Sequence, residues 1–306
     1  MKKPELLAPA GGMNTLRAAV EAGADAVYLG AGKFSARAYA QNFDGDMLAE
    51  AVRYATAHHV KLHLAVNTLM TDRELNEAMD LVGYARGLGV AAFIVQDLGL
   101  ARRIKGAFPD VVLHASTQMT ACSLGDVVAL GRLGFSRVVM ARELSRDALG
   151  YIAANTEVEL EVFVHGALCS SYSGQCLMSS FFGGRSANRG KCAQPCRLPY
   201  KQGNKRGVLL SLKDLCLIKC ISQLTHFGAA ALKIEGRMKG ADYVRTVVAT
   251  YRAALDGNVP TEKQINKMLG VFNRGGYTDG YFTGHKQDMY MTALKNPYKG
   301  EHAHGH

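Results

Sequence analysis

Residues 61–96 read KLHLAVNTLMTDRELNEAMDLVGYARGLGVAAFIVQ and contain one complete unit of the predicted fold. The apolar run Leu62–Val66 has the length and composition of a strand buried on both faces of a parallel sheet. Thr71 begins a capping-box pattern, which predicts the start of a helix, and Gly89 predicts the end of that helix. Because the apolar run Ala92–Val95 follows at once, the stretch predicts a strand, a helix and a second strand.

The same alternation of apolar run and amphipathic helix continues along most of the chain. The apolar runs are Leu6–Ala8, Ala26–Leu29, Leu62–Val66, Ala92–Val95, Val111–His114, Arg137–Met140, Leu160–Val164 and Ala231–Glu235. Eight such units predict an α/β fold, namely a parallel (β/α)8 barrel of the TIM-barrel type. An open doubly wound sheet is the alternative, although no Gly-x-Gly-x-x-Gly fingerprint opens a first helix. We expect the barrel to occupy residues 1–257 and a C-terminal extension and tail to occupy residues 258–306.

One interval between strands is much longer than the others, and it follows the seventh strand. We expect a Cys-rich, basic insertion at residues 166–213, after a strand's carboxyl end, where the active sites of such barrels form. Residues 162–213 contain no Asp or Glu. The same residues include the lysines and arginines Arg185, Arg189, Lys191, Arg197, Lys201, Lys205, Arg206 and Lys213.

Composition sets limits on the class of protein. The chain of 306 residues has 36 Lys and Arg against 26 Asp and Glu, a net charge of +10 that favours an acidic partner such as nucleic acid. No apolar run approaches the ~18 residues that span a bilayer, and no secretory signal opens the sequence. Seven cysteines without such a signal argue against a disulfide framework. We therefore expect a cytoplasmic protein with no membrane partner.

Four cysteines of the insertion form the strongest chemical motif. Six, fifteen and three residues separate Cys169, Cys176, Cys192 and Cys196 in turn. Four thiolates hold either a tetrahedral zinc ion or a 4Fe-4S cluster, and the tight C-x2-C pair typical of structural zinc sites is missing. A thiolate-bound cluster is anionic, and acid-free, Arg-rich surroundings would offset its charge. Four unrelated buried thiols are the plainer alternative.

Polar residues lie at the ends of the predicted strands or just after them, where a barrel would bring them to one site. Four of them carry proton-transfer groups and are the candidate catalytic residues: Glu143, His165, Lys233 and Glu235. Four others carry amide or guanidinium groups and are the candidate substrate-binding residues: Asn67, Gln118, Arg142 and Arg237. Helix caps and ion pairs at the rim are the alternative explanation for any one of them. The basic side chains of the insertion are candidates for RNA binding, namely Arg185, Arg189, Lys191, Arg197 and Lys201.

Several motifs together resemble the peptidase U32 family, which is also described as collagenase-like. They include EVFVHGALC at 161–169, YSGQCLMS at 172–179, ELLAPAG at 5–11, and KIEGR at 233–237. The resemblance covers nearly the whole chain. Within the family, GRSANRG at 184–190 and CAQPCRLPY at 192–200 are most similar to the ribosomal RNA branch, although members of that branch carry a longer C-terminal region.

The resemblance implies oxygen-independent hydroxylation of a pyrimidine in RNA. A cytidine in ribosomal RNA is the favoured target and a uridine in tRNA the next. It also implies that the four cysteines hold a 4Fe-4S cluster and that prephenate is the small-molecule hydroxyl donor. Peptidase activity, a hydroxylation subunit of ubiquinone biosynthesis and a non-catalytic RNA-binding module are the alternatives. No His-Glu-x-x-His and no Gly-x-Ser-x-Gly elbow supports the peptidase.

Overall fold

The computed structural model describes residues 3–37, 40–43 and 45–291. Within these residues, eight parallel strands close into a barrel, because β11 pairs with both β1 and β7. The strands are β1 (Glu5–Pro9), β2 (Ala26–Gly30), β3 (Lys61–Val66), β4 (Ala92–Val95), β5 (Leu113–Ala115), β6 (Arg137–Val139), β7 (Glu159–Gly166) and β11 (Ala231–Ile234). The predicted (β/α)8 barrel is confirmed, and the open sheet is excluded.

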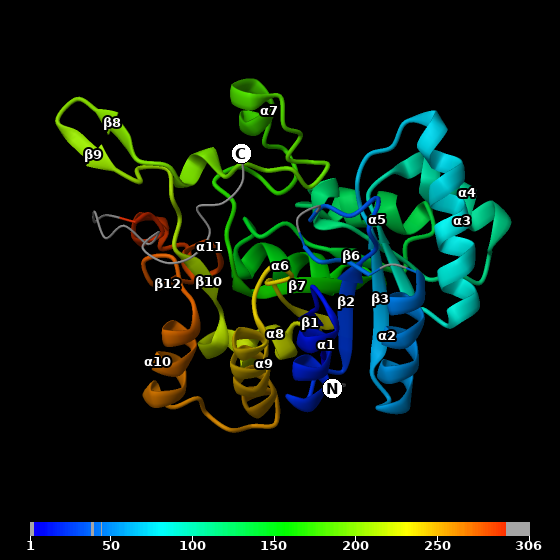
Figure 1. Cartoon of the computed structure of the whole chain (residues 1–306). Helices are drawn as coiled ribbons and strands as arrows, with labels where there is room; N and C mark the ends of the chain where they lie inside the picture. Colours follow the sequence, from blue (N-terminus) through cyan, green and yellow to red (C-terminus); the bar gives the residue numbers. More distant parts are fainter. Residues whose placement is uncertain (1–2, 38–39, 44, 292–306) are drawn as a thin grey trace.

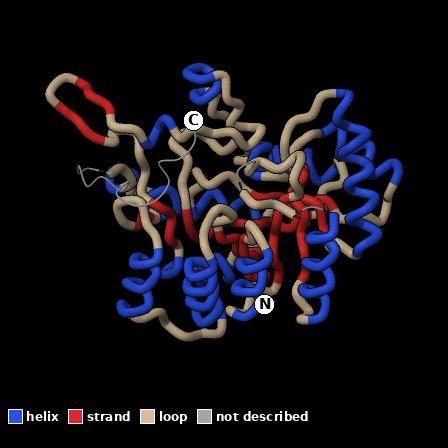
Figure 2. The backbone as a smooth tube through the Cα atoms, in the orientation of Figure 1, coloured by secondary structure: helices blue, strands red, loops and turns tan. Residues whose placement is uncertain are grey.

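Helices connect the strands and cover the outside of the barrel (Figures 1 and 2). They are α1 (Met13–Glu21), α2 (Gly45–Ala57), α3 (Asp72–Leu88), α4 (Leu98–Ala107), α5 (Leu124–Arg132), α6 (Arg146–Ala154), α8 (Ile221–His226) and α9 (Ala241–Leu255). The predicted capping box at the start of α3 is present, since Thr71 N donates to Glu74 Oε2 at 2.8 Å. Gly89 ends this helix with a φ of 95°, a left-handed conformation that glycine adopts without strain.

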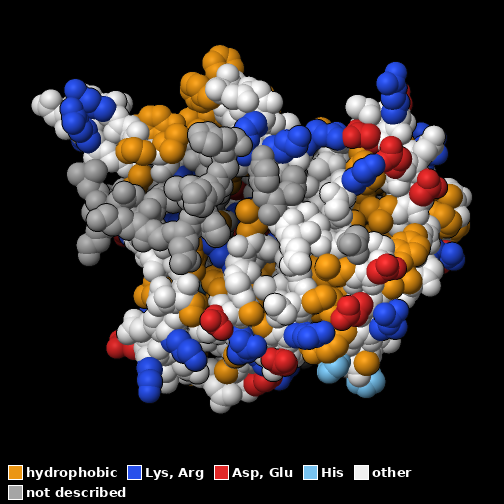
Figure 3. All heavy atoms as spheres, viewed as in Figure 1, with side chains coloured by type: hydrophobic (Ala, Val, Ile, Leu, Met, Phe, Trp, Pro, Cys, Tyr) orange, Lys and Arg blue, Asp and Glu red, His pale blue; other side chains and the backbone are white. Residues whose placement is uncertain are grey.

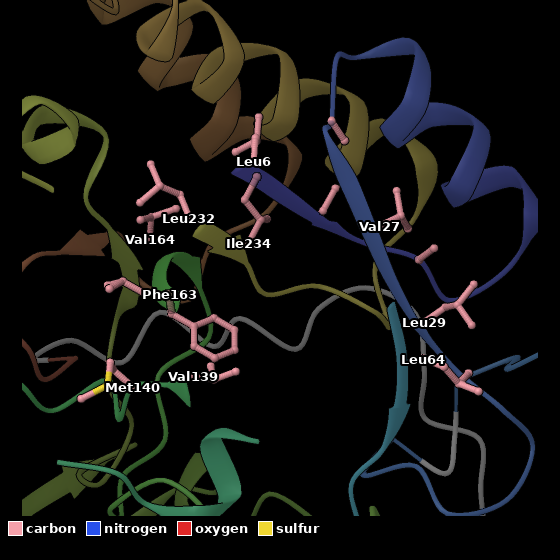
Figure 4. Packing of buried hydrophobic residues seen from close by; sticks show 14 of the residues in the cluster. Leu6, Val27, Leu29, Leu64, Val139, Met140, Phe163, Val164, Leu232 and Ile234 are labelled. Carbon is pink, nitrogen blue, oxygen red and sulfur yellow. The ribbon is translucent and has the colours of Figure 1, made fainter. Parts of the chain in front are cut away.

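The main apolar core lies between the strands and the surrounding helices. Figure 4 shows Leu6, Val27 and Leu64 among the buried side chains of this cluster. Successive residues of a strand face opposite sides, so the neighbours Leu7 and Tyr28 belong to a separate, smaller cluster. The strands therefore bury apolar side chains on both faces, as their continuous apolar runs predict.

Buried ion pairs occupy part of the barrel interior. Lys233 Nζ donates to Glu161 Oε1 at 2.7 Å, and Arg137 Nη1 donates to Glu5 Oε1 at 2.7 Å. Both carboxylates are fully or largely buried. Their charges are compensated at contact distance, as buried ions require.

The long interval between β7 and β11 has structure of its own. It contains α7 (Met178–Gly183), η2 (Pro195–Arg197), β8 (Tyr200–Gln202), β9 (Lys205–Gly207), β10 (Asp214–Cys216) and η3 (Ile218–Cys220). Figure 1 shows α7 and the β8–β9 hairpin projecting from the barrel. The chain returns through β10, which pairs antiparallel with the end of β7.

The region after residue 257 packs on the barrel. It forms α10 (Glu262–Val271), β12 (Tyr277–Thr278), α11 (Gly280–Thr283) and η4 (Lys286–Asp288), and β12 pairs with β10. Met268, Phe282 and Met289 join the main core. The predicted tail, including the terminal histidines, lies outside the described residues from 292 onward. Among the described helices, none combines the length and the hydropathy that crossing a bilayer requires.

Candidate active site at the barrel mouth

Glu235 is the centre of a charged group at the carboxyl ends of the strands. Its Oε2 accepts hydrogen bonds from Arg142 Nη2 at 2.8 Å and from Arg37 Nη2 at 3.1 Å. Gly236 N donates to the other carboxylate oxygen at 3.1 Å. Burial alone would raise the pKa of Glu235, but the charges of Arg37 and Arg142 outweigh it and hold the pKa at about 2. Glu235 is therefore ionised, and its charge compensates neighbouring arginines.

Arg237 is the third arginine of this group. Its Nη1 donates to Ser35 Oγ at 2.6 Å, and its side chain is buried. Burial and the nearby charge of Arg37 lower the pKa of Arg237 to about 10. A Cβ on Gly30, at the end of β2, would lie 2.5 Å from Arg237 Nη1, so only glycine leaves room for this pair. We call Arg37, Asn67, Arg142, Glu235 and Arg237 the mouth cluster.

Two predicted amide residues hold the loop that carries Arg37. Asn67 Oδ1 accepts from Ala36 N at 3.0 Å, and Asn67 Nδ2 donates to Ser116 Oγ at 3.2 Å. Gln118 Nε2 donates to the backbone oxygen of Asn67 at 2.8 Å. Asn67 and Gln118 thus come together as predicted, and in this structure they position Arg37.

Two predicted proton-transfer residues flank the mouth cluster at different depths. Ser173 Oγ donates to both carboxylate oxygens of Glu143 at 3.3 Å, and burial raises the pKa of Glu143. Lys233 lies deeper, bound to Glu161, with its Nζ 4.3 Å from the centre of the Tyr28 ring. Burial lowers the pKa of Lys233, although Glu161 opposes this effect. Glu143 is therefore more readily protonated than Glu235, which makes it the better candidate for proton transfer.

The prediction that His165 lies at the mouth is wrong. The register between β7 and β11 shifts after Lys233, and the extra residue turns His165 outward. Its ring lies among three tyrosines, Tyr243, Tyr251 and Tyr277, and Tyr251 Oη is 3.3 Å from His165 Nδ1. Burial lowers the pKa of His165 to about 3, so the imidazole is neutral.

The four cysteines of the insertion lie on loops or on the short η2 turn. Cys169 lies shortly after β7, Cys176 precedes α7, and Cys196 lies in η2. Cys192 is exposed, and all four thiols are free. Burial raises the pKa of Cys196, and the other three cysteines add to this effect. Cys196 is therefore close enough to the other three cysteines for their charges to affect its thiol.

The surroundings of these thiols fit a thiolate-bound cluster. Gln194 N donates to Cys192 Sγ at 3.3 Å, and Ser179 Oγ lies 3.8 Å from the same sulfur. Glu235 raises the pKa of Arg37, and Cys192 and Cys169 add to this effect, so Arg37 lies near these two cysteines. Hydrogen bonds to sulfur and nearby cations stabilise anionic iron–sulfur clusters. Among the described residues, no three His, Cys, Asp or Glu side chains are grouped to hold a single metal ion. In a cubane, each thiolate binds a different iron, so the sulfurs need not converge on one atom.

The predicted RNA-binding residues divide into exposed and engaged groups. Lys191 and Lys201 are exposed, and half-buried Arg185 donates through Nε to the Lys191 oxygen at 3.1 Å. Arg189 instead binds Glu74 of α3, and this hydrogen bond lowers the pKa of Glu74 to about 2. Arg189 thus ties the insertion to the barrel.

The structure contradicts the prediction that Arg197 binds RNA at the surface. Its side chain is buried, and Nη1 donates to Ser211 Oγ at 2.7 Å and to the Leu212 oxygen. Nη2 donates to the Leu168 oxygen. A guanidinium with five donors can satisfy several carbonyls at once, so Arg197 fastens η2 to both ends of the insertion.

Arg37 is the functional candidate that the sequence prediction missed. It lies in the loop between β2 and α2, seven residues after Gly30, so it does not directly follow a strand. Its only signal is an arginine in a loop at the catalytic end of a barrel strand, which is too common to single it out.

The chain belongs to Peptidase family U32, which it matches over residues 11–292. It is 41% identical over 259 residues to "23S rRNA 5-hydroxycytidine C2501 synthase" of Escherichia coli (strain K12), covering 82% of this chain and 39% of that protein. It is 38% identical over 272 residues to "tRNA hydroxylation protein P1" of Bacillus subtilis (strain 168), covering 83% of this chain and 64% of that protein. The chain thus spans less than two thirds of the length of either relative.

Two further similar proteins have names that describe a peptidase. A "Collagenase" of Porphyromonas gingivalis (strain ATCC BAA-308 / W83) is 33% identical over 310 residues, covering 92% of this chain and 74% of that protein. The solved structure titled "The Structure of the U32 Peptidase Mk0906" has a TM-score of 0.54 at 13% identity, covering 78% of this chain and 94% of that one. The structural likeness supports the barrel fold alone.

Proposed function

We propose that this chain is an iron–sulfur enzyme that hydroxylates a pyrimidine base in RNA without oxygen. A cytidine of ribosomal RNA is the favoured target and a uridine of tRNA the second. One observation carries the proposal: four free cysteines affect one another electrostatically, and two of them, Cys169 and Cys192, also affect Arg37 of the mouth cluster. The names of the relatives from Escherichia coli and Bacillus subtilis support RNA as the substrate.

Cys169, Cys176, Cys192 and Cys196 would hold a 4Fe-4S cluster. Such a cluster supplies one-electron chemistry when bound. The residues of the chain create its environment: the Gln194 amide donates to the Cys192 sulfur, and Arg37 adds positive charge nearby. Both features favour an anionic cluster at the edge of the mouth.

The mouth cluster would bind the hydroxyl donor, for which we propose prephenate. Prephenate carries two carboxylates, and guanidinium groups bind carboxylates through paired hydrogen bonds. Arg37 and Arg142 share the Glu235 carboxylate, which holds them ready at one point of the mouth. Glu143, whose pKa is raised by burial, would donate or accept a proton beside the donor.

The exposed cations of the insertion would bind the RNA backbone. Lys191 and Lys201 are exposed, within a stretch that contains no acidic residue from 162 to 213. Phosphate contacts position a nucleic acid, and the target base would leave its stack to reach the mouth. The same surface would suit either ribosomal RNA or tRNA, so charge does not decide the target.

Nucleoside mass spectrometry of RNA from a strain that lacks the gene tests the proposal. We expect loss of 5-hydroxycytidine from ribosomal RNA, or of a hydroxylated uridine from tRNA. Wild type should restore the nucleoside, Cys192→Ser should not, and Cys122→Ser is the matched control because Cys122 lies outside the set. An unchanged nucleoside profile in the deletion strain would refute RNA hydroxylation.

Peptidase activity is the second candidate, favoured by the collagenase name of one relative. Purified, iron-loaded protein should be incubated with gelatin and denatured collagen. Cleavage that survives Cys169→Ala would support a peptidase, because it would not depend on the cluster. Absence of cleavage by wild type would remove this candidate.

A further inference from the structure

Two neighbouring phenylalanines of α7 are mostly exposed to solvent. Phe181 is 88% exposed and Phe182 is 71% exposed, and Leu177 beside them is 73% exposed. The two ring centroids lie 5.8 Å apart with planes at 84°. A contiguous exposed apolar group of this kind typically marks a binding surface.

This aromatic pair is fixed in place relative to the cysteines. Ser179 Oγ accepts from Ala193 N at 3.0 Å and lies 3.8 Å from Cys192 Sγ, so α7 is tied to the loop of Cys192. Ser180 Oγ donates to the Arg185 oxygen at 3.2 Å, after a left-handed Gly184 ends the helix. The rings therefore lie on an anchored turn close to one candidate cluster ligand.

The insertion that carries the pair has basic side chains and no acidic one. The exposed cations Lys191, Lys201, Lys205 and Arg206 belong to a stretch without Asp or Glu. Across the described residues, none of these four side chains forms a salt bridge. Figure 3 shows apolar side chains at α7 and Lys and Arg side chains on the β8–β9 hairpin, both on projecting parts of the molecule. A surface with aromatic faces and free cations fits a polyanion whose units also carry flat rings.

We propose that Phe181 and Phe182 form a stacking platform for unpaired RNA bases near the modified nucleotide, an inference that rests on the proposed function. Bases stack on aromatic side chains whatever their sequence, while lysines of the same insertion contact phosphate. The rings meet at a steep angle, so each keeps a face open to a different base. An anionic lipid surface would also attract aromatic and basic side chains, but it would have no requirement for a ring face.

The experiment compares binding of a short single-stranded RNA and of its fully paired duplex to the iron-loaded full chain by fluorescence anisotropy. Phe181→Ala/Phe182→Ala should weaken single-strand binding roughly tenfold or more, and duplex binding by less than about twofold. Tyr151→Ala is the matched control, since Tyr151 is 62% exposed on α6, and it should bind as wild type does. Iron content and circular dichroism should match wild type in every variant.

Two further variants separate stacking from apolar contact. Phe181→Trp/Phe182→Trp should retain single-strand affinity, whereas Phe181→Leu/Phe182→Leu should lose it as the alanine variant does. Wild-type affinity in the leucine or alanine variant would overturn the platform. Equal loss of single-strand and duplex binding would also overturn it. So would Phe-dependent binding to phosphatidylserine vesicles with RNA affinity unchanged.

The two proposals fail separately. If the deletion strain keeps all its modified pyrimidines while RNA binding depends on the phenylalanines, hydroxylation is refuted and the platform stands. If the alanine variant binds RNA and restores modification as wild type does, the platform is refuted and hydroxylation stands.

Discussion

Arg142 and Glu235 meet across the barrel mouth, with Arg142 Nη2 2.8 Å from Glu235 Oε2. Arg142 follows β6 and Glu235 follows β11, so the contact joins strands that are not neighbours. Arg142 also stacks on the Phe163 ring, at 3.8 Å from its centre. The pair therefore depends on the closed barrel, and it holds a guanidinium group in a defined position before any substrate arrives.

Glu235→Gln should lower the free energy of unfolding by about 2–4 kcal/mol, because it leaves nearby arginines without their shared counter-charge. Arg37 is 37% exposed, so solvent reduces the effect below that of a fully buried pair. Urea denaturation measures this change in the free energy of unfolding. Glu50→Gln, at an exposed carboxylate paired with exposed Arg17, is the control and should change stability little. Equal effects in both variants would contradict the role of Glu235.

The same variant should change how stability depends on pH. The pKa of Glu235 is about 2 in the folded protein, against an ordinary value of 4.5. A lowered pKa contributes stability that is complete above pH 4.5 and is lost as the pH falls toward 2. Wild type should therefore lose more stability than Glu235→Gln over this window. If the stability of wild type and of Glu235→Gln fell equally over this window, the arginines would not be holding Glu235 ionised.

Arg197→Met should loosen the insertion without a direct effect on charge recognition. The change leaves three buried acceptors without their donor, so the free energy of unfolding should fall by about 2–4 kcal/mol. Limited proteolysis should show faster cutting within residues 166–213. Lys201→Ala, which removes an exposed cation from the same segment, should not. Weaker RNA binding with normal stability and proteolysis would restore the surface role that the sequence predicted.

Reversing the hairpin charges should weaken RNA binding mainly by electrostatics. Lys201→Glu, Lys205→Glu and Arg206→Glu together remove up to three phosphate contacts. The slope of log affinity against log salt should become shallower by about 2, since each contact with a single strand contributes about 0.7. The same titration with the paired changes Lys263→Glu and Lys267→Glu on α10 is the control. A salt slope unchanged by the hairpin variant would exclude the hairpin from RNA binding.

His165→Phe should flatten the acid side of the stability curve. Burial holds the pKa of His165 at about 3, well below its ordinary 6.5. The neutral imidazole makes its full contribution to the free energy of unfolding above pH 6.5. This contribution is lost as the pH falls toward 3, at up to about 1.4 kcal/mol per pH unit. Wild type should lose stability faster than the variant in this window. If NMR instead shows His165 titrating near pH 6.5, the imidazole is not buried among the three tyrosines.

The sequence predicts most of the fold because buried parallel strands appear as short apolar runs and helices carry their own end signals. Thr71 and Gly89 mark the limits of α3 correctly. His165 was misplaced because a one-residue bulge, which has no signal in an apolar run, reverses the direction of a side chain.

The site was less predictable because its contacts join distant residues. Arg197 looks like any other residue of a basic run, but its acceptors come from Leu168 and Ser211–Leu212. Arg37 reaches Glu235 across 198 positions of sequence. The contact between Arg142 and Glu235 was predictable from their positions at strand ends, because a closed barrel brings strand ends to one place.

Iron and acid-labile sulfide analysis of anaerobically purified protein is the decisive test of whether the four cysteines bind a cluster. We predict a brown protein with about four iron and four sulfide per chain. Cys192→Ser should lose both, and Cys122→Ser should keep both. A colourless wild-type protein that binds one zinc, or one whose iron content is unaffected by Cys192→Ser, would contradict it.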